Sequence, residues 1–204
     1  MYIHHTYANT GIRYLALGDS YTIGEGVPIS KSFPFQLSEF LINKGISVHS
    51  ITIVAQTGWR ADQLYEAMNN SSLLPPYDLV TLLIGVNNEY QQHSPELFKY
   101  EFEKVLHKVI TLSNNIFVLT IPDYGHTPFG VYNQSIISTR IQQYNEVIRS
   151  VCNREDVECI DITPLTLGGI NDPTLLAADG LHPSPVMYKN WVNFIGVKVS
   201  KIFA

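Results

Sequence analysis

Apolar runs and apolar stripes alternate along this chain. Five short apolar runs have the length and composition of buried strands, at residues 13–17, 48–54, 79–84, 116–120 and 157–162. Five longer segments have the character of helices, the clearest of them with apolar residues every three or four positions, at residues 33–44, 61–69, 95–113, 137–152 and 185–202. Strands that alternate with helices predict a parallel sheet covered by helices on both faces.

The first apolar run ends at a candidate nucleophile. Ser20 follows Gly18 and Asp19 directly after this run, and open α/β sheets bind their ligands at the carboxyl ends of strands. A plain turn is the alternative interpretation, because Gly, Asp and Ser all favour turns.

A base for this serine lies near the other end of the chain. Asp179 and His182 are three residues apart in one segment that Pro183 stiffens. A serine hydroxyl is a weak nucleophile that needs an adjacent base, usually a histidine oriented by a third group. The carboxylate of Asp179 can accept a hydrogen bond from the Nδ1–H of His182 and leave Nε2 facing Ser20. The alternative is a turn before the last helix that contains an incidental histidine.

Two further strand ends offer hydrogen-bond donors. Gly58 follows the second apolar run, and Asn87 follows the third. Acyl transfer passes through a tetrahedral oxyanion, which backbone N–H groups and Asn side chains stabilise. Each signal alone is also an ordinary turn sequence. Both, however, fall just after a predicted strand, as Ser20 does.

In this order the blocks Gly18-Asp19-Ser20, Gly58, Gly85-x-Asn87 and Asp179-x-x-His182-Pro183 resemble the SGNH (GDSL) hydrolases. The resemblance covers residues 18–183. It implies an α/β fold with three α/β/α layers, flavodoxin-like, around a doubly wound five-stranded parallel sheet of strand order 2-1-3-4-5. It also implies ester hydrolysis without a metal or cofactor. Ser20 would be the nucleophile and Asp179 and His182 would complete the triad, while the oxyanion donors would be the Ser20 N–H, the Gly58 N–H and the Asn87 side chain.

Two positions depart from the usual pattern of that family. Gln56-Thr57 precedes Gly58 where an Asn often stands, and Asn88 follows Asn87 where an Asp is common. Neither change removes a catalytic group. Both affect the hydrogen bonds that position Gly58 and Asn87, so the resemblance implies a reaction without naming a substrate.

A long loop at residues 121–132 is predicted to form a wall of the substrate pocket. It follows the fourth strand without a periodic pattern, and loops of this length are often functional. Aromatic residues in this loop and at other strand ends are candidate pocket residues, namely Tyr21, Trp59, Tyr90, Tyr124, Phe129 and Tyr132. The alternative for each ring is packing within its own loop. Asp123 and His126 supply too few ligands for a metal, so no metal site is predicted.

Composition indicates one domain over residues 1–204, with residues 1–11 as a polar lead segment. The chain has 204 residues, is 45% hydrophobic and carries a net charge of −5. This charge argues against a nucleic-acid partner. No apolar stretch reaches the length of a membrane span and no signal peptide is evident, so we expect a cytoplasmic protein. Cys152 and Cys159 are too few for a disulfide framework and are expected to be free thiols.

The best-supported function from sequence is a serine hydrolase for a small-molecule ester with a small or moderate acyl group. Lipid, aryl and acetylated carbohydrate esters all remain open, and so does the oligomeric state. The main alternative is a flavodoxin-like binding module that uses residues 20–24 as an anion loop, although this leaves Asp179 and His182 unexplained. A catalytically inactive scaffold of the same fold is a further alternative. An enzyme of the α/β-hydrolase type would need a Gly-x-Ser-x-Gly elbow, which the sequence lacks.

Overall fold

The computed structural model describes residues 1–203 and contains one six-stranded sheet. The strands lie in the order β1-β3-β2-β4-β5-β6. All neighbours are parallel except β1 and β3, which are antiparallel. The strands are β1 (Tyr2–Thr6), β2 (Ile12–Gly18), β3 (Val48–Ala55), β4 (Leu79–Leu83), β5 (Ile116–Leu119) and β6 (Glu158–Ile160).

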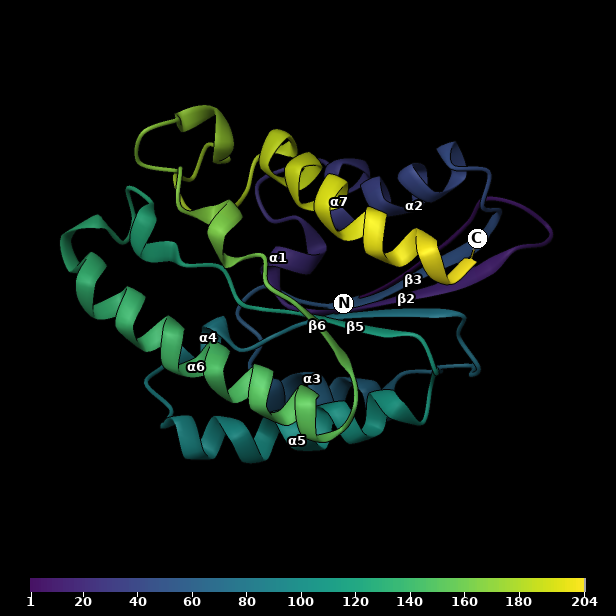
Figure 1. Ribbon diagram of the computed structural model, residues 1–204, viewed down its shortest axis with the longest axis horizontal. Helices are drawn as coiled ribbons and strands as arrows, with labels where there is room; N and C mark the ends of the chain where they lie inside the picture. The colour runs from purple at the N-terminus through teal and green to yellow at the C-terminus, as the bar shows by residue number, and fades with distance from the viewer. Residues whose placement is uncertain (204) are drawn as a thin grey trace.

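Helices cover both faces of the sheet, which gives three layers (Figure 1). One layer contains α2 (Phe33–Asn43) and α7 (Pro185–Ser200), and the other contains α3 (Ala61–Asn70), α5 (Pro95–Ile110) and α6 (Gln134–Arg154). Two short helices, α1 (Ser20–Ile23) and α4 (Val86–Tyr90), follow β2 and β4 directly. Over residues 1–203, none of the helices combines the length and the apolar character needed to cross a lipid bilayer.

The five predicted strands are confirmed in the expected order, but the expected strand count is wrong. A sixth strand, β1, forms from the polar lead segment and pairs with the outer edge of β3. Only Ile3 in this strand is partly buried, and the other four residues are exposed. Backbone hydrogen bonds to a neighbouring strand are enough to hold an edge strand, so β1 has no hydrophobic pattern by which to find it.

The central position of β2 determines where the candidate site residues gather. Residues 14–17 of this strand are fully buried. At its end, Gly18 is in register with Ala55 of β3 on one side and with Leu83 of β4 on the other. The three strands therefore end at the same level, and the segments that follow them begin side by side at one edge of the sheet.

Candidate active site

Ser20 is the first residue of α1 and is held in a tight turn after β2. The side chain of Asp19 caps this helix by accepting a hydrogen bond from the Tyr21 N–H at 3.0 Å. A Cβ at Gly18 would collide with the carbonyl oxygen of Leu83 and with the hydroxyl of Thr22. Glycine at this position therefore allows the end of β2 to approach β4 closely. The result is a buried serine presented at the strand end.

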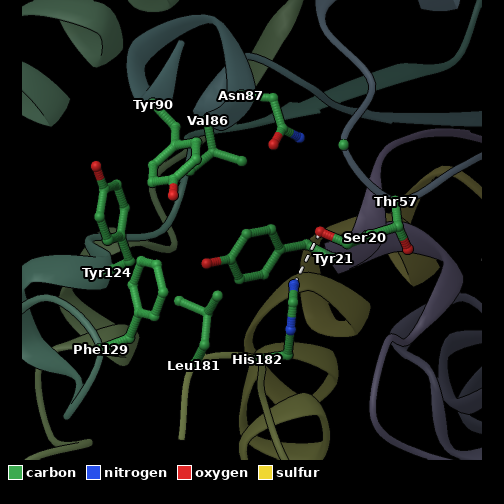
Figure 2. Close-up of a pocket in the computed structure, with 11 residues that line it drawn as sticks. Ser20, Tyr21, Thr57, Val86, Asn87, Tyr90, Tyr124, Phe129, Leu181 and His182 are labelled. Atoms are coloured by element: carbon green, nitrogen blue, oxygen red, sulfur yellow. Dashed lines mark hydrogen bonds between the residues drawn. The ribbon is translucent and has the colours of Figure 1, made fainter. Parts of the chain in front are cut away.

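His182 and Asp179 form a hydrogen-bonded chain that ends at this serine. His182 Nε2 lies 2.9 Å from Ser20 Oγ, and His182 Nδ1 lies 2.7 Å from Asp179 Oδ2. Figure 2 shows the contact between Ser20 and His182 at the edge of a pocket. The second carboxylate oxygen of Asp179 accepts the backbone N–H groups of Leu181 and His182 at 2.9 and 3.0 Å. The loop is thus folded around the carboxylate that orients the imidazole.

The ionisation of Asp179 suits this role. Partial burial opposes the charged form, but the hydrogen bonds that the carboxylate accepts from the ring and backbone of His182 and from the Leu181 N–H outweigh it, and the pKa of Asp179 is lowered. An ionised carboxylate at Nδ1 leaves Nε2 free to accept the proton of Ser20.

Hydrogen-bond donors lie around the same serine. Within residues 1–203, neither the Ser20 N–H nor the Gly58 N–H bonds to another backbone group. Gly58 has a φ of +83°, a left-handed conformation that glycine adopts without strain. The Asn87 side chain lines the same pocket as Ser20, Gly58 and His182 (Figure 2). The arrangement can therefore bind an oxyanion as well as transfer a proton.

The pocket is small and mainly apolar. Its volume is about 200 Å³. It is lined by Ser20, Tyr21, Thr57, Gly58, Val86, Asn87, Tyr90, Tyr124, Phe129, Leu181 and His182. Thr57, Val86 and Leu181 were not predicted. Each stands next to a candidate site residue in the sequence, which is the signal that could have identified them.

Two of the six predicted aromatic residues do not line the pocket. Tyr132 lies in a 3₁₀ turn (Val131–Asn133) and is 95% exposed, so its ring points into solvent. Trp59 is partly buried against the hydrophobic core. Tyr21, Tyr90, Tyr124 and Phe129 do line the cavity. The composition of a loop indicates that rings are available but does not indicate where each ring points.

Comparison with known proteins identifies the family. The family model described as the GDSL-like lipase/acylhydrolase family matches residues 16–189. The chain belongs to this family. As a GDSL-like lipase/acylhydrolase, it is a carboxylic ester hydrolase. No curated protein matches the sequence.

Solved structures share the fold of this GDSL-like hydrolase at low sequence identity. A lipase/acylhydrolase from Enterococcus faecalis has a TM-score of 0.74 and 19% identity, over 93% of this chain and 96% of that one. An acetylxylan esterase from Geobacillus stearothermophilus has a TM-score of 0.74 and 16% identity, over 93% and 94% of the two chains. A member of the lipolytic G-D-S-L family from Veillonella parvula has a TM-score of 0.71 and 14% identity, over 92% and 97%.

Other contacts hold the Gly58 loop of this GDSL-like hydrolase in place of the Asn that the sequence lacks. The Asn87 side chain donates to the Trp59 carbonyl oxygen at 3.0 Å, and the Gln91 side chain donates to the Gly58 carbonyl oxygen at 3.3 Å. The Thr57 hydroxyl donates to Glu25. The loop is thus held on one side by α4 and Gln91, which follows it. On the other side it is held by Glu25, which follows α1.

The second departure, Asn88, has a hydrogen-bond partner, Glu101, that the local sequence does not reveal. Asn88 is fully buried, accepts the Ala61 N–H at 2.9 Å and donates to Glu101 of α5 at 2.5 Å. An aspartate at position 88 could accept from Ala61 but could not donate to a carboxylate. The substitution therefore fits a neighbour that is itself acidic, and Asn88 joins the start of α3 to α5.

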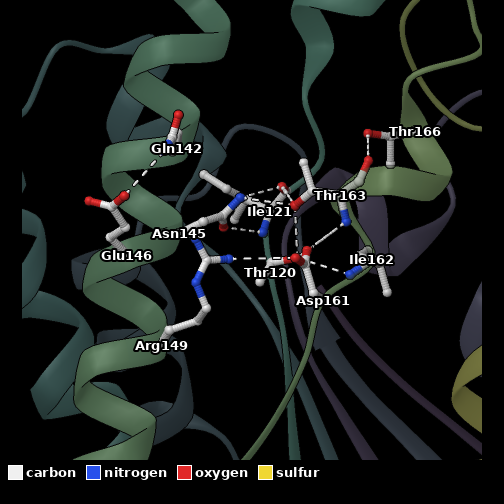
Figure 3. A network of polar contacts seen from close by, with 10 residues as sticks. All are labelled: Thr120, Ile121, Gln142, Asn145, Glu146, Arg149, Asp161, Ile162, Thr163 and Thr166. Atoms are coloured by element: carbon white, nitrogen blue, oxygen red, sulfur yellow. Dashed lines mark hydrogen bonds and ion pairs between the residues drawn. The ribbon is translucent and has the colours of Figure 1, made fainter.

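Buried polar contacts also fix the loop at residues 121–132. The Asn145 side chain bonds both to the N–H and to the carbonyl oxygen of Ile121, at 2.8 and 3.1 Å, and to the hydroxyl of Thr163 (Figure 3). Further along the loop, the Tyr124 hydroxyl donates to the buried Glu89 at 2.7 Å. The pocket wall is therefore anchored at its start and at one of its rings.

Asp123 and His126 in this loop do not form a second relay. Their closest side-chain atoms, Oδ2 and Nε2, are 3.8 Å apart, which is too long for a hydrogen bond. Asp123 Oδ1 accepts the Gly125 N–H instead. Among the residues that the structure describes, no group of three or more His, Cys, Asp or Glu side chains is arranged to hold a metal ion.

Asp19 gives the protein a predicted pH dependence of stability. Complete burial raises the pKa of its carboxyl to about 7, against the lowering effect of the hydrogen bonds from Tyr21 and Asn87. Between about pH 4 and pH 7 the folded protein holds this proton and the unfolded chain releases it, so the contribution of Asp19 makes stability fall as pH rises. The full effect is at most about 4 kcal/mol. Urea unfolding should show that the unfolding free energy of wild type falls relative to that of Asp19→Asn as pH rises across this range. A difference that is constant with pH would contradict the raised pKa.

Proposed function

We propose that this protein hydrolyses carboxylic esters with a short acyl group through a Ser20–His182–Asp179 triad and an acyl-enzyme. The observation that carries the proposal is the unbroken chain from Asp179 Oδ2 through His182 to Ser20 Oγ, with contacts of 2.7 and 2.9 Å. A serine at a strand end without such a base would be a weak nucleophile.

The proposed reaction has two halves. In the first, His182 Nε2 takes the Ser20 proton while Oγ attacks the ester carbonyl carbon, and the Ser20 N–H, the Gly58 N–H and the Asn87 amide stabilise the oxyanion. The imidazolium then gives its proton to the leaving alkoxide, and the acyl-enzyme remains. In the second half, His182 deprotonates a water molecule that attacks the acyl carbon, and Ser20 leaves with its proton restored.

The size of the cavity supports a short acyl group. A volume of about 200 Å³ is below the range of roughly 300 to 1,000 Å³ that drug-sized ligands occupy. Similar solved structures include acetylxylan esterases, and an acetyl group fits a cavity of this size. Acetylated carbohydrates are therefore among the candidate substrates, together with short aryl esters.

Covalent labelling tests the nucleophile. A fluorophosphonate probe should label the wild-type protein, and Ser20→Ala should remove the label while circular dichroism shows an unchanged fold. Labelling that persists in Ser20→Ala would show that another residue reacts. Purified protein that is yellow with bound flavin and does not react with the probe would favour the flavodoxin-like binding module.

The assignment of Asn87 makes a separate prediction. Loss of one oxyanion donor lowers turnover by about 10² to 10³, so Asn87→Ala should lower kcat by a factor in this range. Asn87 also holds the Trp59 carbonyl oxygen, so thermal unfolding of the variant should be measured beside its kinetics. A folded Asn87→Ala variant with full activity would mean that Asn87 is wrongly assigned.

A further inference from the structure

The Tyr21 hydroxyl faces the cavity and has no hydrogen-bond partner among residues 1–203. Tyr21 is 3% exposed and lines the pocket. Figure 2 shows its hydroxyl directed away from Ser20 toward the end of the cavity where Phe129 and Leu181 lie. This hydroxyl is not among the sealed polar atoms that lack a partner in residues 1–203, so a ligand in the cavity can reach it.

The other two tyrosine hydroxyls of the cavity differ from that of Tyr21. The Tyr124 hydroxyl donates to Glu89 at 2.7 Å. Tyr90 is 55% exposed, so water can serve its hydroxyl. Val86, Phe129 and Leu181 add apolar surface to the lining of the cavity. Tyr21 therefore places an unpaired hydroxyl that faces the cavity among apolar side chains.

The position of this hydroxyl is fixed relative to the reacting atoms. The Tyr21 N–H bonds to Asp19 at 3.0 Å, and the Tyr21 carbonyl oxygen accepts the Tyr188 hydroxyl at 3.0 Å. The Tyr21 ring packs on His182, with centroids 5.2 Å apart, and stacks on Trp191 at 6.5 Å. A group held on both sides in this way can recognise a ligand without first becoming ordered.

The hydroxyl is also kept neutral. Burial, followed by the nearby charge of Asp19, raises the pKa of the Tyr21 phenol above its usual value. A neutral phenol can donate a hydrogen bond to an ether oxygen, or either donate to or accept from a hydroxyl. A hydrocarbon group at the same place would leave the phenol unpaired, which is unfavourable in an apolar site.

We propose that Tyr21 is a specificity-determining residue whose hydroxyl hydrogen-bonds an ether or hydroxyl oxygen in the part of the substrate that occupies the aromatic end of the cavity. The preferred substrates are then esters in which this part carries an oxygen, such as alkoxyacyl esters or acetates of cyclic ethers and sugars. Hydrocarbon esters of the same shape are weaker substrates. This inference rests on the proposed ester hydrolysis by Ser20.

Two pairs of esters of matched shape test the proposal. On the acyl side, 4-nitrophenyl methoxyacetate differs from 4-nitrophenyl butyrate by an oxygen in place of a methylene. On the alcohol side, (tetrahydropyran-2-yl)methyl acetate differs from cyclohexylmethyl acetate in the same way. The quantity measured is the ratio of kcat/KM within each pair, for wild type and for Tyr21→Phe. Dividing the two ratios cancels the intrinsic reactivity of each ester.

Tyr21→Phe keeps the ring and removes only the hydroxyl. We expect the preference for the oxygen-bearing ester to fall about 3- to 10-fold in at least one pair, as expected for one hydrogen bond. Activity on the hydrocarbon member of that pair should rise relative to the oxygen-bearing member, because Tyr21→Phe removes the hydroxyl that this ester leaves unpaired. The pair that responds identifies whether the acyl or the alcohol part occupies this end of the cavity.

Tyr188→Phe is the matched control, because it removes the buried hydroxyl that contacts the Tyr21 backbone outside the pocket. Both members of each pair should respond equally to it, so its ratios should equal those of wild type. Unchanged ratios in Tyr21→Phe for both pairs would overturn the proposal, as would an equal change of ratio in Tyr188→Phe. If the wild type hydrolyses no ester and Ser20 does not react with the probe, the proposed function itself has failed.

Discussion

His182→Ala is expected to lower kcat for ester hydrolysis by roughly 10⁶-fold, to near the background rate. The variant removes the base that contacts Ser20 Oγ at 2.9 Å. Without it the serine proton has no acceptor, and the leaving alkoxide has no donor. Steady-state rates on 4-nitrophenyl acetate, corrected for spontaneous hydrolysis, measure the loss.

His126→Ala is the matched control for this variant. His126 also follows an aspartate by three residues and also lies in a strand-end loop. Its Nε2 is 3.8 Å from Asp123 Oδ2, and its ring contacts Gln134 rather than a serine. This variant should therefore keep most of its activity. A large loss of activity in His126→Ala together with a small loss in His182→Ala would show that His182 is not the base.

Local patterns predicted the elements of this fold, while the resemblance predicted their arrangement. The apolar run before Ser20 is central in the sheet and buried on both faces, so its composition alone identified a strand. The strand order 2-1-3-4-5 depends on contacts between distant segments and came from the family. β1 was missed because its pairing with β3 uses backbone groups, which every residue carries.

The sequence blocks that the family shares predicted which residues form the candidate site. The structure adds supporting contacts that no single block reveals. Asn88 departs from the family pattern, and its partner Glu101 lies on α5. Gln91 supports Gly58 from 33 residues away. Such pairs depend on where helices pack against one another, and one sequence does not contain that information.

The pocket was the least predictable part of the site. Tyr132 and Phe129 belong to the same loop, yet one ring is in solvent and the other lines the cavity. Leu181 lines the cavity because it precedes His182 in a loop that curls around Asp179. The direction of each side chain follows from local turn geometry, which aromatic composition does not encode.

Two aspartates lie close to the proposed nucleophile, and replacing each with asparagine should distinguish their roles. Asp179→Asn is expected to lower kcat about 10⁴-fold, because an amide at Oδ2 donates to His182 Nδ1 and leaves the ring proton on Nε2. That nitrogen then faces Ser20 as a donor and cannot accept its proton. Asp19→Asn should have a smaller effect on kcat, since an asparagine oxygen still accepts the Tyr21 N–H. The comparison is made on kcat at a pH where both variants are folded by circular dichroism. A larger loss in Asp19→Asn than in Asp179→Asn would make Asp19 the triad acid, and would require His182 to be oriented by a residue that it does not contact in this structure.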